Sequence, residues 1–231
     1  MPQPFSNLEA GQIRVFEDPR VHWALEQFGS VNSQTVLELG PLEGAHTYML
    51  ERAGFGSIVS IEANPRAYLK CLIVKEILEL TRTHFLCGDF IEYLRNSPAR
   101  VDAVFASGVL YHMIDPAELI ALISKITGRL FLWTHYYDAG LISRNRKVAR
   151  RFKSDDRTEY AGFEHRLFRY DYRGSFRLAR FCGGSRPYAH WMLREEIIAC
   201  LKHFGFDEIR TGFEEPGHPN GPAFALVALR R

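Results

Sequence analysis

The stretch VLELGPLEGAHTYML, from Val36 to Leu50, decides the fold of this chain. It begins with a short apolar run that is typical of a buried strand. A turn containing Gly40 and Gly44 follows, and then the opening of a helix. Glycines in such a turn let the backbone approach a ligand closely, and the first turn of the helix points free amide groups at it. The stretch therefore predicts a ligand site at the end of a strand.

A second apolar run, SIVSIEANP, carries Glu62 near its end, 22 residues after Gly40. An acidic residue at about this distance from the glycine turn can accept hydrogen bonds from both hydroxyls of a ribose. The two runs together predict a nucleoside-containing cofactor at the end of a parallel sheet.

From Thr35 onward, short apolar runs alternate with segments of helical periodicity. The predicted strands are Val36–Leu39, Ile58–Ile61, His84–Cys87, Val101–Ala106 and Leu130–Thr134, and the predicted helices are Gly44–Ala53, Pro65–Leu80, Phe90–Asn96 and Pro116–Thr127. Such alternation favours right-handed crossovers and a parallel sheet with helices on both faces. Ligands of these sheets bind outside the carboxyl ends of the strands.

The last part of the chain departs from this alternation. A helix is predicted at Leu193–Phe204, a strand near Phe206–Gly212 and a final strand at Ala223–Leu229, with the turn-rich EEPGHPNGP between the strands. We therefore expect an antiparallel hairpin at the edge of the sheet. The predicted organisation is an N-terminal helical segment (1–34), one α/β domain (35–135 and 191–231) and an insertion (136–190). Asp18 is expected to cap a helix that runs to Phe28.

Bulk properties narrow the class of protein. The chain has 231 residues, 46% of them hydrophobic and 24% charged, with a net charge of +2. Its longest apolar runs are too short to span a bilayer, and its first residues lack the features of a signal peptide. The four cysteines are scattered without metal-ligand spacing. We expect a reduced cytoplasmic protein with no metal and no membrane association, either monomeric or homodimeric.

The insertion is basic and aromatic. Between Tyr136 and His190 there are thirteen Lys/Arg, six Asp/Glu and eleven Phe/Tyr. Two clusters, Arg144–Lys153 and His165–Arg180, carry most of the arginines. Arginine suits carboxylate or phosphate, and aromatic rings can stack on a ring or a base. The second cluster is therefore a candidate ribbon or lid over a substrate, while a solvated basic face with a small satellite core is the alternative. The following Gly183–Trp191 resembles a turn back to the domain.

Four motifs together resemble those of class I S-adenosylmethionine-dependent methyltransferases. They are ELGPLEG (Glu38–Gly44), IEAN (Ile61–Asn64), CGDF (Cys87–Phe90) and VDAVFASGVLYHM (Val101–Met113). The resemblance covers roughly residues 30–135 and 190–231. SGVLYH and WMLREEIIACLKHFGF are more specifically similar to the wobble-uridine tRNA carboxymethyltransferases and to methyltransferase-domain proteins of bacterial biosynthetic clusters. The resemblance implies a Rossmann-like, mostly parallel sheet of seven strands with an insertion after the fifth.

The resemblance also implies the cofactor, S-adenosylmethionine, and its product, S-adenosylhomocysteine. Gly40 and Gly44 would pass the methionine part, Glu38 would lie near its amino group, Glu62 would bind the ribose, and Asp89 would face the adenine. The cofactor-binding residues implied in this way are Glu38, Gly40, Gly44, Thr47, Glu62, Ala63, Gly88, Asp89, Phe90, Ser107 and Gly108. The family usually has a glycine where this chain has Leu42, which is therefore left out of the set.

Residues after the fourth and fifth strands are candidates for the acceptor side. His135 is the preferred general base and His112 the second candidate, because an unperturbed imidazole titrates near neutral pH. For His112 the alternative is shaping the cofactor pocket or capping a helix, and for His135 a structurally satisfied histidine. Tyr136 is a third catalytic candidate. The candidate substrate-binding residues are Tyr111, Tyr137, Arg166, Arg169, Tyr188 and His190.

Several functions remain open from the sequence. The first is methyl transfer to an O, N or C nucleophile of a small anionic or aromatic metabolite in a biosynthetic pathway. The second is methyl or carboxymethyl transfer to tRNA, suggested by the basic aromatic insertion. A non-catalytic scaffold that binds a nucleotide cofactor is a third. A nucleotide-dependent oxidoreductase is disfavoured, because GxGxxG is missing and the chain ends in a strand pair.

Overall fold

The computed structural model describes residues 1, 15–96, 99–178, 181, 183–184 and 186–231. Seven strands form the main sheet, in the order β3-β2-β1-β4-β5-β10-β9. Their bounds are β1 Thr35–Leu39, β2 Ser57–Glu62, β3 Thr83–Cys87, β4 Ala103–Ser107, β5 Arg129–His135, β9 Glu208–Glu215 and β10 Ala223–Leu229. The first five are parallel, and β10 runs antiparallel to both β5 and β9. The predicted α/β fold with an antiparallel strand pair at the edge is confirmed.

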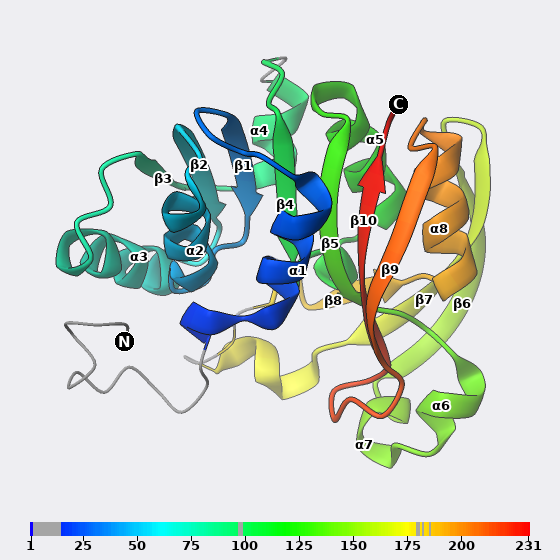
Figure 1. The fold of residues 1–231 in the computed structure, drawn as a ribbon. Coiled ribbons are helices and arrows are strands. Elements are labelled where there is room, and N and C mark those ends of the chain that lie inside the picture. The colour runs from blue at the N-terminus through cyan, green and yellow to red at the C-terminus, as the bar shows by residue number, and fades with distance from the viewer. Residues whose placement is uncertain (2–14, 97–98, 179–180, 182, 185) are drawn as a thin grey trace.

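Helices cover both faces of this sheet (Figure 1). They are α1 Pro19–Phe28, α2 Ala45–Ala53, α3 Pro65–Ile77, α4 Phe90–Asn96, α5 Pro116–Ile126 and α8 Arg194–His203, with short 3-10 turns η1 Val15–Glu17 and η2 Leu110–His112. One core packs α1 and α2 against the sheet, and the other packs α4, α5 and α8 against the opposite face. Alternate residues of each strand enter the two cores, so the central strands are mostly apolar on both faces.

Helix starts follow the local sequence signals. Asp18 caps α1 by accepting the backbone N–H of Arg20, and Pro19 is the first helical residue, as expected from the sequence. Asn64 caps α3 by accepting from Arg66 and Ala67. The α3 helix ends at Ile77 rather than at Leu80, since Glu79 already has a positive φ of 51°.

The insertion forms a second, three-stranded sheet with the order β6-β7-β8. Its elements are α6 Ala139–Ser143, α7 Arg146–Ala149, β6 Phe152–Tyr160, β7 Phe163–Asp171, η3 Arg173–Arg177 and β8 Tyr188–Trp191. The β6–β7 hairpin is closed by a two-residue turn at Ala161 and Gly162, which both have positive φ. The second basic cluster, in which a ribbon was expected, contributes only its first residues, 165–171, to this hairpin. Residues 179–180 of the second basic cluster lie outside the described residues.

Two expectations for the insertion are corrected. Residues 188–191 form strand β8 and not a turn, because they pair with β7 and the backbone of His190 also donates to the carbonyl of Met113. The insertion's sheet therefore extends one residue past the expected boundary, to Trp191. The β8 strand joins the second sheet to the segment after β4 and thereby brings the insertion next to the carboxyl ends of the main strands.

Candidate functional site

The loop after β1 lies where the strand order reverses, between β1 and β4. Gly40 has a φ of 66°, and a methyl group added to it would lie 2.6 Å from Cγ1 of Val109 in the segment after β4. Its N–H donates to the carbonyl of Ile61 at 2.9 Å. Only glycine fits this position, and it brings the ends of β1, β2 and β4 together at the point where ligands of such sheets bind.

Leu42 has the backbone conformation that favours glycine, with a φ of 55°. Its N–H donates to Oε2 of Glu62 at 2.9 Å, and its side chain is 45% exposed. A left-handed conformation costs an L-residue roughly 1–2 kcal/mol. The turn therefore has the glycine-type geometry that the family's motif requires, although a leucine occupies it.

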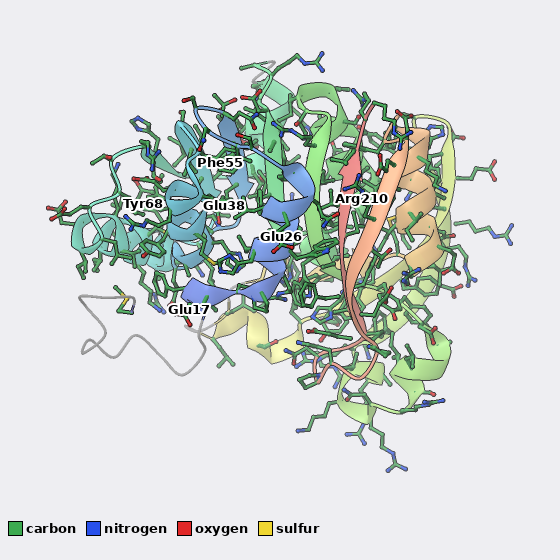
Figure 2. All side chains as sticks on the ribbon, in the orientation of Figure 1. Glu17, Glu26, Glu38, Phe55, Tyr68 and Arg210 are labelled. Carbon is green, nitrogen blue, oxygen red and sulfur yellow. The ribbon has the colours of Figure 1, made fainter. Side chains whose placement is uncertain are left out.

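Glu38 is a buried carboxylate near the carboxyl end of β1, beside β2 and α2 (Figure 2). Its Oε2 accepts from the hydroxyl of Thr47, which is itself fully buried, and from the hydroxyl of Ser60 at 2.7 Å. Among the residues that the structure describes, Oε1 has no hydrogen-bond partner. Burial raises the pKa of Glu38, against the hydrogen bond from Thr47 and the charge of His46. One oxygen is thus fixed, and the other can accept from a ligand.

Glu62 ends β2 and is also buried. Its Oε1 accepts from the N–H of Asn64 at 2.8 Å, while Oε2 accepts from the N–H of Leu42. Burial raises its pKa, and these backbone hydrogen bonds oppose the rise. A carboxylate has about four lone-pair sites, so both oxygens can still accept from the hydroxyl groups of a ribose.

The loop after β3 completes this end of the sheet. Gly88 donates its N–H to the carbonyl of Glu62 at 3.0 Å. Asp89 is exposed and caps the start of α4 by accepting from Ile91. Phe90 packs in the core beside α4 and α5, so its ring belongs to the interior.

Three further predicted cofactor residues lie at the ends of β2 and β4. Ala63 is exposed directly after Glu62. Gly108 follows the half-buried Ser107, has a φ of 81°, and donates its N–H to the carbonyl of Trp133. The structure thus brings the predicted cofactor residues of four strand ends to one edge of the sheet, with Thr47 and Phe90 as supporting residues behind it.

His135 ends β5 and is buried. Its Nδ1 lies 2.9 Å from the carbonyl oxygen of Gly221 and 3.3 Å from that of Pro222, just before β10. A carbonyl only accepts, so Nδ1 carries the proton and Nε2 has the lone pair. Burial and then the charge of His218 lower the pKa of His135 to about 4, which keeps the ring neutral near pH 7.

His135 belongs to an aromatic cluster that four separate segments build. The aromatic cluster consists of Tyr111, Trp133, His135, Trp191 and His218. The ring of Trp191 stacks on His135 with centroids 5.1 Å apart, and Tyr111 meets His135 edge-on at 4.5 Å. The aromatic cluster therefore brings imidazole, indole and phenol groups together on the acceptor side.

His112 lies beside the aromatic cluster, with its ring 4.2 Å from that of Tyr111. Its Nδ1 forms a hydrogen bond with the hydroxyl of Tyr172. Burial, with a smaller effect from the charge of His135, lowers the pKa of His112 to about 3. His112 therefore links the insertion to the site and is also neutral near pH 7.

Tyr136 and Tyr137 are not brought to His135. Tyr136 points to the opposite face of the sheet and packs edge-on against Phe224 in the core. Burial raises its pKa. Tyr137 stacks on Phe168 of the insertion with ring centroids 3.6 Å apart.

The remaining predicted substrate residues lie on the second sheet. Arg166 pairs with Asp155, and Arg169 lies over the ring of Tyr188 at 4.0 Å. His190 donates from Nδ1 to the carbonyl of Ile114 at 2.6 Å. Their interactions therefore hold the insertion together and attach it to the segment after β4.

Several residues of the site could not be identified from the sequence. Arg20 lies over Trp133, 4.6 Å from the ring centroid, and is fixed by Asp18, which also contacts His46 at 2.9 Å. Burial raises the pKa of Asp18, but the hydrogen bonds from His46 and Arg20 outweigh it and bring the pKa well below the usual range. His218 comes from the turn between β9 and β10, whose composition indicates only a turn.

Neither a metal centre nor a membrane span is found in the described part of the chain. No group of three or more His, Cys, Asp or Glu side chains there could hold a metal ion. Of the helices that the structure describes, none is long and apolar enough to cross a bilayer.

Comparisons with known proteins agree with this geometry. A family model described as a methyltransferase domain matches residues 37–129, which include the loops after β1, β2, β3 and β4. A search of curated proteins finds no match.

Solved structures share the fold across nearly the whole chain. The N-terminal domain of EvdMO1, crystallised with S-adenosylhomocysteine, has a TM-score of 0.72 at 23% identity, and the match covers 93% of this chain and 82% of that domain. Full-length EvdMO1 has a TM-score of 0.64 at 24% identity, covering 99% of this chain and 45% of that one. Magnesium protoporphyrin IX methyltransferase from Synechocystis, with bound S-adenosylhomocysteine, has a TM-score of 0.64 at 18% identity and coverage of 96% and 90%. Residues 37–129 therefore match a methyltransferase domain, and nearly the whole chain shares the fold of solved structures that bind S-adenosylhomocysteine.

Proposed function

We propose that this protein binds S-adenosylmethionine at the loops after β1, β2 and β3 and transfers its methyl group to a small molecule held at the aromatic cluster. The observation that carries the proposal is the pair of buried carboxylates, Glu38 and Glu62, on either side of the Gly40 turn. Glu38 keeps one oxygen without a partner among the described residues, and Glu62 accepts from backbone groups of both neighbouring loops.

The residues present fit the chemistry of this cofactor. An ammonium group suits the open oxygen of Glu38, and two ribose hydroxyls suit the carboxylate of Glu62. Gly40 lets the loop after β1 pack closely against Val109 of the segment after β4, which brings the two loops of the site together. When bound, the sulfonium supplies an activated methyl group, so the protein's own tasks are to align the acceptor, exclude water and accept a proton.

The residues of the acceptor side support these tasks. Tyr111 follows the end of β4, and His135 ends the neighbouring β5. Both strand ends lie at the same edge of the sheet as Gly40, and the second sheet joins that edge through β8. His135 is neutral, and its Nε2 has the lone pair, so it can accept a proton.

The solved relatives support the cofactor part of the proposal. The N-terminal domain of EvdMO1 and the Synechocystis enzyme are described with S-adenosylhomocysteine bound. EvdMO1's domain was also crystallised in the presence of D-fucose, and the Synechocystis enzyme is named for a porphyrin. The acceptor of this chain therefore has to be read from its own residues.

A small acceptor is favoured over RNA by the way the insertion's arginines are used. Arg166 is paired with Asp155, Arg169 lies on Tyr188, and Arg151 donates to the carbonyl of Tyr172. Binding to tRNA through such residues would weaken steeply with salt. Micromolar tRNA binding with a steep salt dependence would favour methyl or carboxymethyl transfer to tRNA instead.

Calorimetric titration with S-adenosylmethionine and S-adenosylhomocysteine tests the donor site directly. We expect saturable binding of both at a 1:1 ratio. Incubation with cofactor carrying a labelled methyl group and a fractionated metabolite extract then tests transfer, with label appearing in a small-molecule fraction. Absence of binding by either compound would overturn the proposal.

A further inference from the structure

The two imidazoles of the aromatic cluster have opposite tautomers. His135 donates from Nδ1 to the carbonyl of Gly221, so its Nε2 accepts. His218 accepts at Nδ1 from the backbone N–H of Asn220 at 3.2 Å, so its single proton is on Nε2. The turn between β9 and β10 sets both tautomers, because Gly221 and Asn220 are neighbours in it.

Nε2 of His135 can accept a hydrogen bond, and Nε2 of His218 can donate one. Both nitrogens are available to a ligand. The rings of His135 and His218 lie 4.9 Å apart, tilted by 56°, and no hydrogen bond joins them. Among the described residues, neither Nε2 has a hydrogen-bond partner.

Two indole donors in the same cluster are also unused. Nε1 of Trp133 and Nε1 of Trp191 are buried, and neither has a hydrogen-bond partner within the described part of the chain. The two side chains are 9% and 2% exposed. Buried N–H groups are rarely left unpaired, because an unpaired one loses its hydrogen bonds to water without replacement. Both rings contact His135, so oxygen atoms of a bound ligand are their natural partners.

We propose that the methyl acceptor is a hydroxyl group on a ring compound, with the hydroxyl proton given to Nε2 of His135 and the oxygen held by the N–H of His218. This rests on the function proposed above and narrows its acceptor to oxygen. His218, which had no assigned role from the sequence, is a second catalytic residue.

A hydroxyl oxygen satisfies both nitrogens while it reacts. It has one proton for His135 and two lone pairs, of which one attacks the methyl group and the other accepts from His218. A neutral amine has a single lone pair, so its attack would leave the N–H of His218 without a partner. A carboxylate has no proton to give, and its oxygens would face the lone pair of neutral His135.

The transfer step is balanced. The O–CH3 bond forms as the bond from the methyl carbon to the sulfonium sulfur breaks, and the bonding electrons of the latter stay on sulfur, which becomes a neutral thioether. The proton of the hydroxyl moves to His135. The resulting imidazolium has a low pKa because of burial and the nearby charge of Arg20, so it loses the proton readily to solvent.

The rings around His135 suit a cyclic acceptor. Tyr111, Trp133 and Trp191 present aromatic surfaces, and the two indole N–H groups match additional ring oxygens. Phenols and sugars share this chemistry. A panel with labelled cofactor separates the sources: catechol and hydroxybenzoates, methyl glycosides of hexoses, and the matched amine and carboxylate compounds aniline and benzoate. We expect label in an ether from one of the first two sets, whereas label only in aniline or benzoate would overturn the inference.

Matched variants test the two nitrogens separately. His135→Asn keeps a side-chain N–H for the carbonyl of Gly221 but removes Nε2. This variant should therefore lower kcat roughly 10²- to 10⁴-fold. His218→Asn keeps an acceptor for Asn220 without the Nε2 donor, and should lower kcat/KM roughly 10- to 100-fold. His218→Gln restores a donor near the position of Nε2 and should recover part of that loss. His84→Gln, at an exposed site on β3, serves as the control.

Cofactor titrations keep the two proposals distinguishable. If wild-type protein does not bind S-adenosylmethionine, the proposed function fails. If all variants bind it with wild-type affinity and His135→Asn or His218→Asn keeps full activity on hydroxyl compounds, the inference alone is overturned. A loss in His218→Asn that His218→Gln partly restores would support the donor role, since a purely structural role predicts the opposite order.

Discussion

The two ends of the site are built in different ways. The cofactor end consists of Glu38, Gly40, Leu42 and Glu62, which come from neighbouring loops and are held mainly by backbone geometry. The acceptor end consists of side chains from α1, η2, β5, β8 and the turn before β10, which meet only in the folded protein. A local sequence motif can therefore specify the site of the methyl donor, whereas long-range packing specifies the site of the methyl acceptor. Substitutions at the two ends should therefore have separable effects.

The largest effect is expected from Gly40→Ala. The added methyl group meets Val109 at 2.6 Å, and φ is 66°. The left-handed conformation and the overpacking together should reduce the free energy of unfolding by roughly 2–5 kcal/mol. Urea denaturation measures it, with Gly174→Ala as the control because an added methyl group there meets nothing within 4 Å. Equal losses in both variants would show that the backbone of this loop is not the critical element.

At the acceptor end, acid should destabilise the protein through His135. Its pKa is lowered from 6.5 in the unfolded chain to about 4, so the unfolded state binds the proton first. Stability should therefore fall as the pH drops from about 6.5 to about 4, by roughly 3 kcal/mol from this group. His135→Asn should narrow the difference in unfolding free energy between pH 7 and pH 4, whereas the exposed His22→Gln should not. An unchanged difference in His135→Asn would mean that His135 titrates normally.

A change confined to the cofactor end is Glu62→Gln. The amide cannot accept from Leu42, Asn64 and two ribose hydroxyls as a carboxylate can. We expect affinity for S-adenosylmethionine to fall roughly 10- to 100-fold, since a hydrogen bond to a charged group is worth about 1.5–3 kcal/mol. Glu43→Gln, which removes a half-buried carboxylate of the loop after β1 that pairs with Lys70 of α3, is the control for calorimetry. Similar affinities for both variants would remove Glu62 from the ribose site.

The smallest effect is expected from Leu42→Gly. Glycine relieves the strain of a φ of 55°, worth roughly 1–2 kcal/mol, but costs roughly 0.5–1 kcal/mol in backbone entropy. The unfolding free energy should rise by at most about 1.5 kcal/mol. Leu42→Val, which places a β-branched side chain in the same conformation, should lower it instead. A loss of stability in Leu42→Gly would show that the exposed leucine side chain itself contributes to the loop.

The main sheet was predictable because its strands are short apolar runs between helical segments. Ala223–Leu229 was predicted at its observed bounds, and the other main strands within a few residues. Strand β6, by contrast, reads FKSDDRTEY and is almost entirely exposed as the edge of the second sheet. With neither face buried, no alternation of polar and apolar residues marks it as a strand.

The site was predictable only where its residues act through local geometry. Glu38, Gly40 and Glu62 lie at strand ends that the sequence identifies. His135 and Tyr136 could not both reach the acceptor, because adjacent strand residues point to opposite faces. His218 had no signal, since its role depends on the tautomer that Asn220 imposes in a turn far along the chain.

The position of β10 couples the edge of the sheet to the acceptor side. This strand lies between β5 and β9, although it follows β9 in the chain. In the described part of the chain β9 joins the main sheet through β10, and the residues that lead into β10 place the carbonyls of Gly221 and Pro222 against Nδ1 of His135. A change that separates β10 from β5 would therefore detach β9 from the sheet and free the tautomer of His135 together.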